Sequence, residues 1–140
     1  MVESASAGDP VADAFLRRFS QASASLDQEA MKDLFAETFL VGDAGGPRVV
    51  PREAFLAALP QRAAQAAAAG LSPAELVAAT VHHLDDHWYV ATATWHAGRV
   101  GGDPLEMRSS YLVYGGNGGN GEARIAAYLN HEGLPLRPTS

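Results

Sequence analysis

Asp43 is the residue of this sequence whose type and position best suit acid–base chemistry. It lies in LFAETFLVGDAGG (residues 34–46), after the strand-like segment TFLV and before three small residues. A carboxylate at a strand end that faces an apolar pocket is suited to proton transfer. An aspartate before Ala-Gly-Gly is also well suited to accept backbone hydrogen bonds in a turn. The sequence leaves both interpretations of Asp43 open.

A histidine-rich segment, HHLDDH (residues 82–87), has the composition of a metal site. His82 and His83 are neighbours on a predicted strand, so their side chains point to opposite faces of the sheet. If residues 85–86 form a two-residue turn, His83 pairs with Trp88 and at most two imidazoles converge. We therefore expect the solvent-exposed tip of a hairpin, and we expect neither a metal nor a cofactor.

The segment WYVATATWHA (residues 88–97) alternates between two kinds of side chain, as a strand does. Two alanines between large aromatic rings leave room for a ligand, unless side chains from a helix fill it. We assign to the inner face Tyr89, Ala91, Ala93 and Trp95, and to the outer face Val90, Thr92, Thr94 and His96. On the next predicted strand the inner positions are Met107, Ser109, Tyr111 and Val113. The predicted ligand-binding residues on these strands are Tyr89, Ala91, Ala93, Trp95, Met107 and Tyr111, the last as hydroxyl donor.

The elements that must position these residues fall into two groups. Helical spacing predicts a helix over residues 10–23, a short helix capped by Asp27, and a long helical stretch between Pro51 and Gly70 that Pro60 kinks or divides. Residues 42–48 read as a loop, and one helical turn could start at Ser72. Alternating strands follow, with GGNGGNG as a loop before the last one. Helices followed by antiparallel strands indicate an α+β fold, a curved sheet with helices on one face.

The composition of the chain limits the kinds of partner that we expect. The chain has 140 residues, a net charge of −6, no cysteine and no clustered basic residues, which argues against nucleic acid and excludes disulfides. No signal peptide and no membrane span is evident, so we expect a cytoplasmic protein without a membrane partner. We predict a disordered N-terminus over residues 1–8, a single domain over 9–134 and a C-terminal tail over 135–140.

The order of elements resembles the nuclear transport factor two-like superfamily, over about residues 10–132. The resemblance rests on that order, on LFAETFLVGDAGG, and on LDDHWYVATATW, RSSYLVY and RIAAYLNHEG as the closing strands. The superfamily includes ketosteroid isomerases, SnoaL-like polyketide cyclases and scytalone dehydratases, with many non-catalytic members. The resemblance implies a cone, in which a curved antiparallel sheet surrounds a pocket and N-terminal helices pack on the concave face. It also implies a homodimer through the outer face of the sheet.

The resemblance also suggests roles for single residues. Asp43 stands at the spacing from Ala36 at which ketosteroid isomerases carry their general base. The positions of their oxyanion donors fall on Phe19 and near Ser110, which cannot replace a tyrosine and an acid, so ketosteroid isomerisation itself is not expected. Some SnoaL-like cyclases place an acid–base residue on the last strand, where His131 could face Asp43 across the pocket; the alternative is an exposed histidine at a strand end.

The function that the resemblance implies is that of a SnoaL-like domain. Such a domain would bind a small apolar or aromatic ligand in the cone, with Phe19 among the lining residues. The pocket could also support Asp43-assisted proton transfer of the isomerase, cyclase or dehydratase kind. The alternatives are a non-catalytic ligand-binding or dimerisation module, or an accessory subunit of a larger enzyme. The sequence does not decide whether the protein is an enzyme.

Overall fold

The computed structural model describes residues 10–115 and 123–131. The predicted terminal segments 1–8 and 135–140, and the loop GGNGGNG apart from Gly115, lie outside the described residues. The elements in chain order are α1 (Pro10–Ser25), α2 (Gln28–Lys32), β1 (Phe35–Asp43), β2 (Gly46–Pro51), α3 (Arg52–Ala68), β3 (Glu75–His83), β4 (Trp88–Arg99), β5 (Gly102–Tyr114) and β6 (Arg124–Asn130).

The first two helices form where apolar spacing and caps predict them. Helix α1 buries one side and runs two residues beyond the predicted end at Ser23; its buried residues are Ala12, Phe15, Leu16, Phe19 and Ala22. Asp27 caps α2 as predicted, because its Oδ1 accepts a hydrogen bond from the backbone N–H of Ala30 at 3.1 Å. These helices carry the apolar surface that covers the sheet.

Helix α3 runs through Pro60 as one helix, where the sequence predicted a kink or a division into two segments. Pro60 has no N–H, so the carbonyl of Leu56, four residues earlier, loses its helical donor. The side-chain amide of Gln28 on α2 donates to this carbonyl instead, with an Nε2–O distance of 2.9 Å. This bond satisfies the carbonyl and ties α2 to α3.

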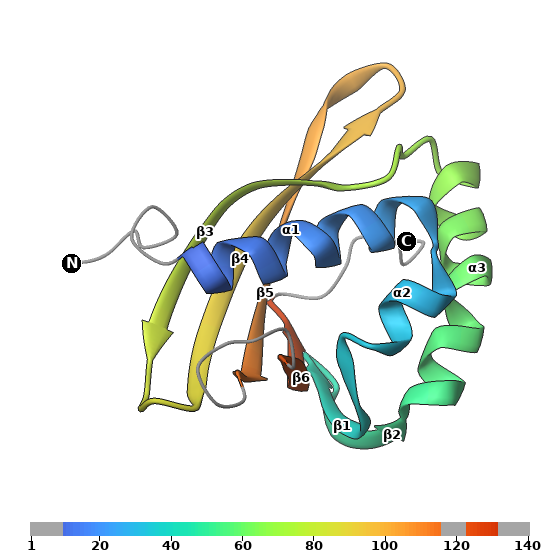
Figure 1. Ribbon diagram of the computed structural model, residues 1–140. Helices are drawn as coiled ribbons and strands as arrows, with labels where there is room; N and C mark the ends of the chain where they lie inside the picture. The colour runs from blue at the N-terminus through green and yellow to red at the C-terminus, as the bar shows by residue number, and fades with distance from the viewer. Residues whose placement is uncertain (1–9, 116–122, 132–140) are drawn as a thin grey trace.

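The six strands form one sheet in the order β2-β1-β6-β5-β4-β3. All neighbouring strands are antiparallel except β1 and β6, which are parallel. Figure 1 shows α1 crossing one face of the sheet, with α2 and α3 beside the β1–β2 end. Helix α1 contacts β3, and α3 contacts β1, β2 and α2. The α+β architecture with helices on one face of the sheet is confirmed.

Two segments differ from the sequence prediction. The predicted loop at residues 42–48 belongs to a hairpin, in which Asp43 pairs with Gly46 and β2 continues through Val49 and Val50 to Pro51. Gly46 has φ +107°, which a glycine adopts without strain. The two prolines of β2 are tolerated because β2 is an edge strand. No helical turn starts at Ser72, whose N–H donates to the carbonyl of Gly98 at 2.9 Å.

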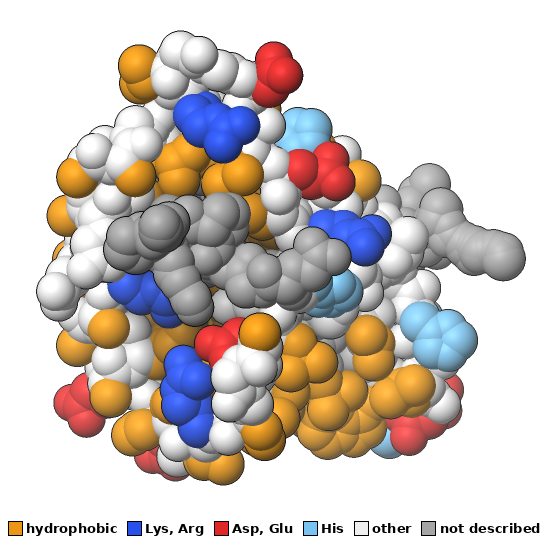
Figure 2. All heavy atoms as spheres, turned by 180° about the vertical axis from the view of Figure 1, so that it is seen from behind, with side chains coloured by type: hydrophobic (Ala, Val, Ile, Leu, Met, Phe, Trp, Pro, Cys, Tyr) orange, Lys and Arg blue, Asp and Glu red, His pale blue; other side chains and the backbone are white. Residues whose placement is uncertain are grey.

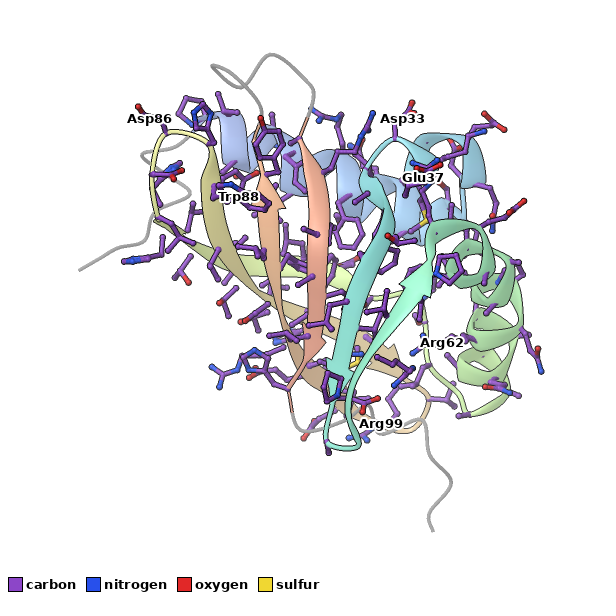
Figure 3. All side chains as sticks on the ribbon, turned by 90° about the horizontal axis from the view of Figure 1, so that it is seen from below. Asp33, Glu37, Arg62, Asp86, Trp88 and Arg99 are labelled. Atoms are coloured by element: carbon purple, nitrogen blue, oxygen red, sulfur yellow. The ribbon has the colours of Figure 1, made fainter. Side chains whose placement is uncertain are left out.

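The β3–β4 hairpin also differs, because a four-residue loop, 84–87, replaces the predicted two-residue turn. His83 consequently pairs with Tyr89 instead of Trp88. Asp85 holds the loop through its Oδ1, which accepts the N–H groups of residues 87 and 88 at 2.8 and 2.9 Å. These backbone hydrogen bonds lower the pKa of Asp85. Figure 3 shows Asp86 at this tip, pointing away from the molecule.

The hydrophobic core lies between the helices and the inner face of the sheet. The largest fully buried side chains come from α1, the start of β1, and strands β5 and β6: Phe15, Leu16, Phe35, Tyr111, Val113 and Ile125. Aromatic rings from different elements meet edge to face, as Phe39 and Phe55 do at 5.0 Å. Within the described residues, no helix is long and apolar enough to cross a membrane.

Candidate functional site

The inner face of β4 and β5 is the wall that the sequence predicted to bind a ligand. The side chains assigned to it are buried, apart from Met107, which is half-buried: Tyr89, Ala91, Ala93, Trp95, Ser109, Tyr111 and Val113. The assignment of this face to the inside is therefore confirmed. The role of its residues in ligand binding stays a prediction.

Phe19 of α1 fills the space beside the two alanines. Its ring centroid lies 5.9 Å from that of Trp95 and 5.2 Å from that of Tyr111, edge to face in both cases. Tyr111 pairs with Ala91, and Trp95 follows Ala93 by two residues, so the phenyl ring lies over this part of β4. Both alanines are 0% exposed. Helix α1 therefore covers this part of the sheet.

Polar side chains gather on the inner side of the sheet next to this aromatic core. We call this group the interior polar cluster; it consists of Trp95, Ser109, Tyr111, Tyr128 and Arg62. The hydroxyl of Tyr111 interacts with the hydroxyls of Ser109 and Tyr128 and with the indole of Trp95. The two tyrosine rings meet edge to face at 5.1 Å. Arg62 of α3 interacts electrostatically with Tyr128.

The two tyrosines of this cluster are hydrogen-bond donors at neutral pH. Burial raises the pKa of Tyr111 well above its ordinary value of 10.0, and the neighbouring Tyr128 adds to the effect. Burial also raises the pKa of Tyr128, although the positive charge of Arg62 and the contact with Tyr111 act in the opposite direction. Each phenol therefore keeps its proton and can donate one hydrogen bond.

A β-bulge turns Tyr128 to the inside. The pairing of β6 with β5 skips Ala126, which has no partner on β5. In a regular strand Ile125 and Tyr128 would face opposite sides of the sheet, but the extra residue places both inside. Simple alternation, which identified the inner face of β4, could not identify Tyr128 for this reason.

Arg62 lies on the side of α3 that faces the sheet. Phe55, Leu59 and Ala66 share this side at helical spacing, and all of them are half-buried. Figure 3 shows the Arg62 side chain leaving α3 toward the sheet. A lone arginine in an otherwise apolar stripe is a signal present in the sequence. The sequence prediction does not include Arg62, because a kink or a break at Pro60 leaves the direction of the following residues undetermined.

Several side chains beside the interior polar cluster are only half-buried. Phe55, Leu59, Met107 and Tyr128 pack against the core but keep part of their surface exposed, and Arg62 is half-buried as well. These residues come from α3 and from the inner face of β5 and β6. Together they form an apolar and aromatic surface between α3 and the sheet, with the polar cluster beside it. We call this surface the open part of the interior.

Asp43 lies at the turn between β1 and β2. Its Oδ1 accepts the N–H of Gly45 at 2.8 Å, and its Oδ2 lies 3.8 Å from the guanidinium of Arg48. Val41, which pairs with Tyr128, is buried, and Asp43 follows it by two residues on the same face of β1. The carboxylate is thus at the end of the strand beside the cluster, but its hydrogen bond belongs to the turn.

His131 lies on the other side of the sheet. Its Nε2 is 2.8 Å from Oγ of Ser110, which is 3.0 Å from Oγ1 of Thr92, and both hydroxyls point to the outer face. Figure 2 shows this side of the molecule, where hydrophobic side chains lie among histidines and charged residues. Hence the structure does not bring His131 and Asp43 together across one cavity, because His131 bonds to Ser110 on the outer face whereas Asp43 follows the inward-facing Val41 on β1.

The histidines of the β3–β4 hairpin are exposed. His82 pairs with Val90 on the outer face, while the ring of His83 lies 5.5 Å from that of Tyr89 on the inner face. Across residues 10–115 and 123–131, no three histidine or acidic side chains are grouped so that they could hold a metal ion.

The cluster offers donors and a positive charge to a ligand. The Ser109 hydroxyl and the Trp95 indole donate to Tyr111 within the cluster, so Tyr128 and the Arg62 guanidinium are the groups that face a ligand as donors. No carboxylate or imidazole belongs to the cluster. Such a set can hold and orient a group with oxygen acceptors. Proton abstraction needs a base, for which Asp43 is the nearest candidate along the inner face of β1.

Neither a comparison with protein-family models nor one with curated protein sequences finds a match. Solved structures do match. An NTF2-like protein of unknown function from Shewanella oneidensis MR-1 has a TM-score of 0.68 at 14% identity, over 88% of this chain and 98% of that one. An NTF2-like protein of unknown function from Pseudomonas putida KT2440 has a TM-score of 0.66 at 16% identity, over 96% and 93%.

A protein of unknown function with a cystatin-like fold from Nostoc punctiforme PCC 73102 has a TM-score of 0.67 at 11% identity, over 97% of this chain and 98% of that one. At such identities a likeness shows the fold and not the activity. The predicted resemblance is confirmed at that level: the chain has the NTF2-like (nuclear transport factor two-like) fold, with helices packed on one face of a mostly antiparallel sheet.

Proposed function

We propose that this protein binds a small aromatic or apolar molecule that carries an oxygen acceptor, in the open part of the interior between α3 and the sheet. The observation that carries the proposal is the interior polar cluster, in which donors from three strands and a helix converge beside half-buried aromatic side chains. Apolar walls with a few convergent polar groups are typical of small-molecule sites. The apolar body would contact Leu59, Met107 and the ring of Tyr128.

The donors explain why an acceptor is expected. Buried or half-buried hydroxyl and N–H groups cost free energy when they lack acceptors, so a ligand oxygen is favoured beside them. Because Tyr111 and Tyr128 contact each other, one of their two hydroxyls donates to the other. One O–H group of the pair then remains to donate to a ligand. A ketone or another carbonyl compound fits this arrangement better than a hydrocarbon of the same shape.

Asp43-assisted proton transfer is the second candidate function. It is favoured by the position of Asp43 on the inner face of β1, two residues beyond the partner of Tyr128. Phenol donors beside a ligand carbonyl would stabilise the negative charge that develops when a neighbouring proton is removed. The turn hydrogen bond to Gly45 would have to break for the carboxylate to reach such a ligand.

A pair of probes of equal shape tests the binding proposal. We expect 2-acetylnaphthalene to bind about two- to tenfold more tightly than 2-ethylnaphthalene, because one hydrogen bond contributes about 0.5–1.5 kcal/mol. Titration followed by NMR should shift the indole N–H signal of Trp95; the chain has two tryptophans, and the Trp88→Phe variant assigns the signals. Tyr128→Phe should abolish the preference for the ketone. If neither compound shifts the Trp95 signal at millimolar concentration, the proposed function is wrong.

A further inference from the structure

Arg62 differs from the other arginines of the described chain in its surroundings. Three arginines are half-buried: Arg52, Arg62 and Arg124. Arg52 donates to the carbonyls of residues 32 and 35 at 3.1 Å each, and Arg124 donates to the carbonyl of Asp33. Both therefore have neutral backbone acceptors in place of water. Arg62, by contrast, interacts electrostatically with the phenol of Tyr128.

No acidic side chain of residues 10–115 or 123–131 forms an ion pair with Arg62; the ion pairs of those residues lie elsewhere. Tyr128 cannot serve as the counter-charge, because its phenol stays neutral at physiological pH. A half-buried guanidinium has lost part of its hydration, and an anion within reach would restore that stabilisation. The position of Arg62 on the sheet-facing side of α3 directs this charge at the open part of the interior.

The neighbours of Arg62 select the kind of anion. A guanidinium presents two parallel N–H groups that match the two oxygens of a carboxylate. Tyr128 supplies a neutral donor on the sheet side, and Leu59 and Phe55 supply apolar surface along the helix. A carboxylate on a compact apolar body satisfies both parts of the site.

We propose that the ligand of this interior site is a small aromatic or apolar carboxylic acid, bound as its anion, with Arg62 as the partner of the carboxylate and Tyr128 as an additional donor. This inference rests on the proposed function and names its ligand class. The chain carries a net charge of −6, so its overall field does not attract anions. Affinity for the acid must therefore come from the local interaction with Arg62. Salt screens this half-buried interaction less than it screens interactions between exposed charges.

The experiment compares 2-naphthoate with 2-acetylnaphthalene, a neutral molecule of nearly the same shape. Isothermal titration calorimetry at pH 7.0 and 0.15 M salt should show about tenfold or tighter binding of 2-naphthoate to the full chain, since hydrogen bonds to charged groups are the strong ones. Arg62→Gln should remove this advantage and leave the affinity for the ketone within about twofold. Arg62→Lys should retain part of it, because the charge stays but the planar fork is lost.

Arg108→Gln is the matched control, because Arg108 is exposed and pairs with Thr94 on the outer side of the sheet. This variant makes the same change in net charge and should leave both affinities unchanged. If the ketone binds and 2-naphthoate binds no more tightly, the carboxylate inference is wrong while the proposed function stands. The carboxylate inference is also wrong if Arg62→Gln and Arg108→Gln lower the affinity for 2-naphthoate equally. If neither probe binds, both are wrong. Urea denaturation of each variant verifies that it is folded.

Discussion

The hydrogen bond that Asp43 makes in its turn allows the two interpretations of this residue to be tested. The turn that it closes uses Oδ1 as the acceptor for Gly45, and an asparagine side chain offers the same oxygen. We therefore expect Asp43→Ala to lower the free energy of unfolding by about 0.5–1.5 kcal/mol, and Asp43→Asn to lower it by less. The ion pair with Arg48 is exposed and adds at most about 1 kcal/mol. Urea denaturation at pH 7 measures both variants.

Equal stability of wild type and Asp43→Ala would mean that the turn does not depend on this carboxylate. Asp43 would then be available for the proton transfer that the resemblance suggests. A clear loss in the alanine variant alone would identify Asp43 as a turn residue. Loss of activity in a stable Asp43→Asn variant, toward a substrate found with the carbonyl probes, would instead support catalysis.

For single residues, the sequence predicted the face of the sheet on which a side chain lies better than it predicted which side chains it contacts. Alternation in WYVATATWHA placed Tyr89, Ala91, Ala93 and Trp95 inside because one register change would expose them all. It did not reveal that Phe19 occupies the space beside the alanines, since that depends on how α1 crosses the sheet. It also missed Tyr128, which a bulge at Ala126 turns inward.

The α2–α3 pair shows how a helix tolerates an internal proline. Gln28 donates to the Leu56 carbonyl that Pro60 leaves without a helical donor, so the two features depend on each other. We expect Gln28→Ala to lower the free energy of unfolding by about 1–3 kcal/mol, as for a buried polar group left unsatisfied. In a Pro60→Ala background the restored N–H can bond to Leu56, and the same change should cost less. The difference between the two costs, measured by urea denaturation, should exceed about 0.5 kcal/mol.

Gln61→Ala serves as the control, because Gln61 is exposed on α3 and should change stability by less than about 0.5 kcal/mol. An equal cost of Gln28→Ala in both backgrounds would show that Gln28 acts through some other contact.

Element boundaries were predicted well where caps and apolar spacing agree, as at Asp27 and along α1. They were predicted poorly where glycine and proline can mean either a loop or a strand end. Residues 42–48 carry both, and only the pairing of β2 with β1 decides that they form a hairpin. Pro60 is ambiguous in the same way, so the sequence did not predict that α3 is one continuous helix. For this reason it also did not predict that Arg62 faces the sheet.

The whole molecule has one sheet with two different faces. Helices cover the inner face, whereas the outer face carries half-buried residues of intermediate polarity such as Thr92, Thr94 and His96. The hydrogen-bonded chain from Thr92 through Ser110 to His131 lies on this outer face, so His131 belongs to a surface and not to the interior site. The two faces therefore differ in character, and our proposals assign ligand binding to the inner face and association to the outer one.

That division leads to the proposal, first suggested by the resemblance, that two copies associate through the outer face of the sheet. Leu129 is 42% exposed there, and the neighbouring face combines apolar and hydroxyl side chains that another copy could cover. We expect light scattering at micromolar concentration to give about twice the 14.7 kDa mass of one chain. Leu129→Lys should shift the mass toward one chain, because it places two like charges near each other in a two-fold interface. Val100→Lys, at the 85% exposed tip of the β4–β5 hairpin, should leave the mass unchanged. A mass near 14.7 kDa for the wild type would refute association, and equal effects of the two variants would place the interface elsewhere.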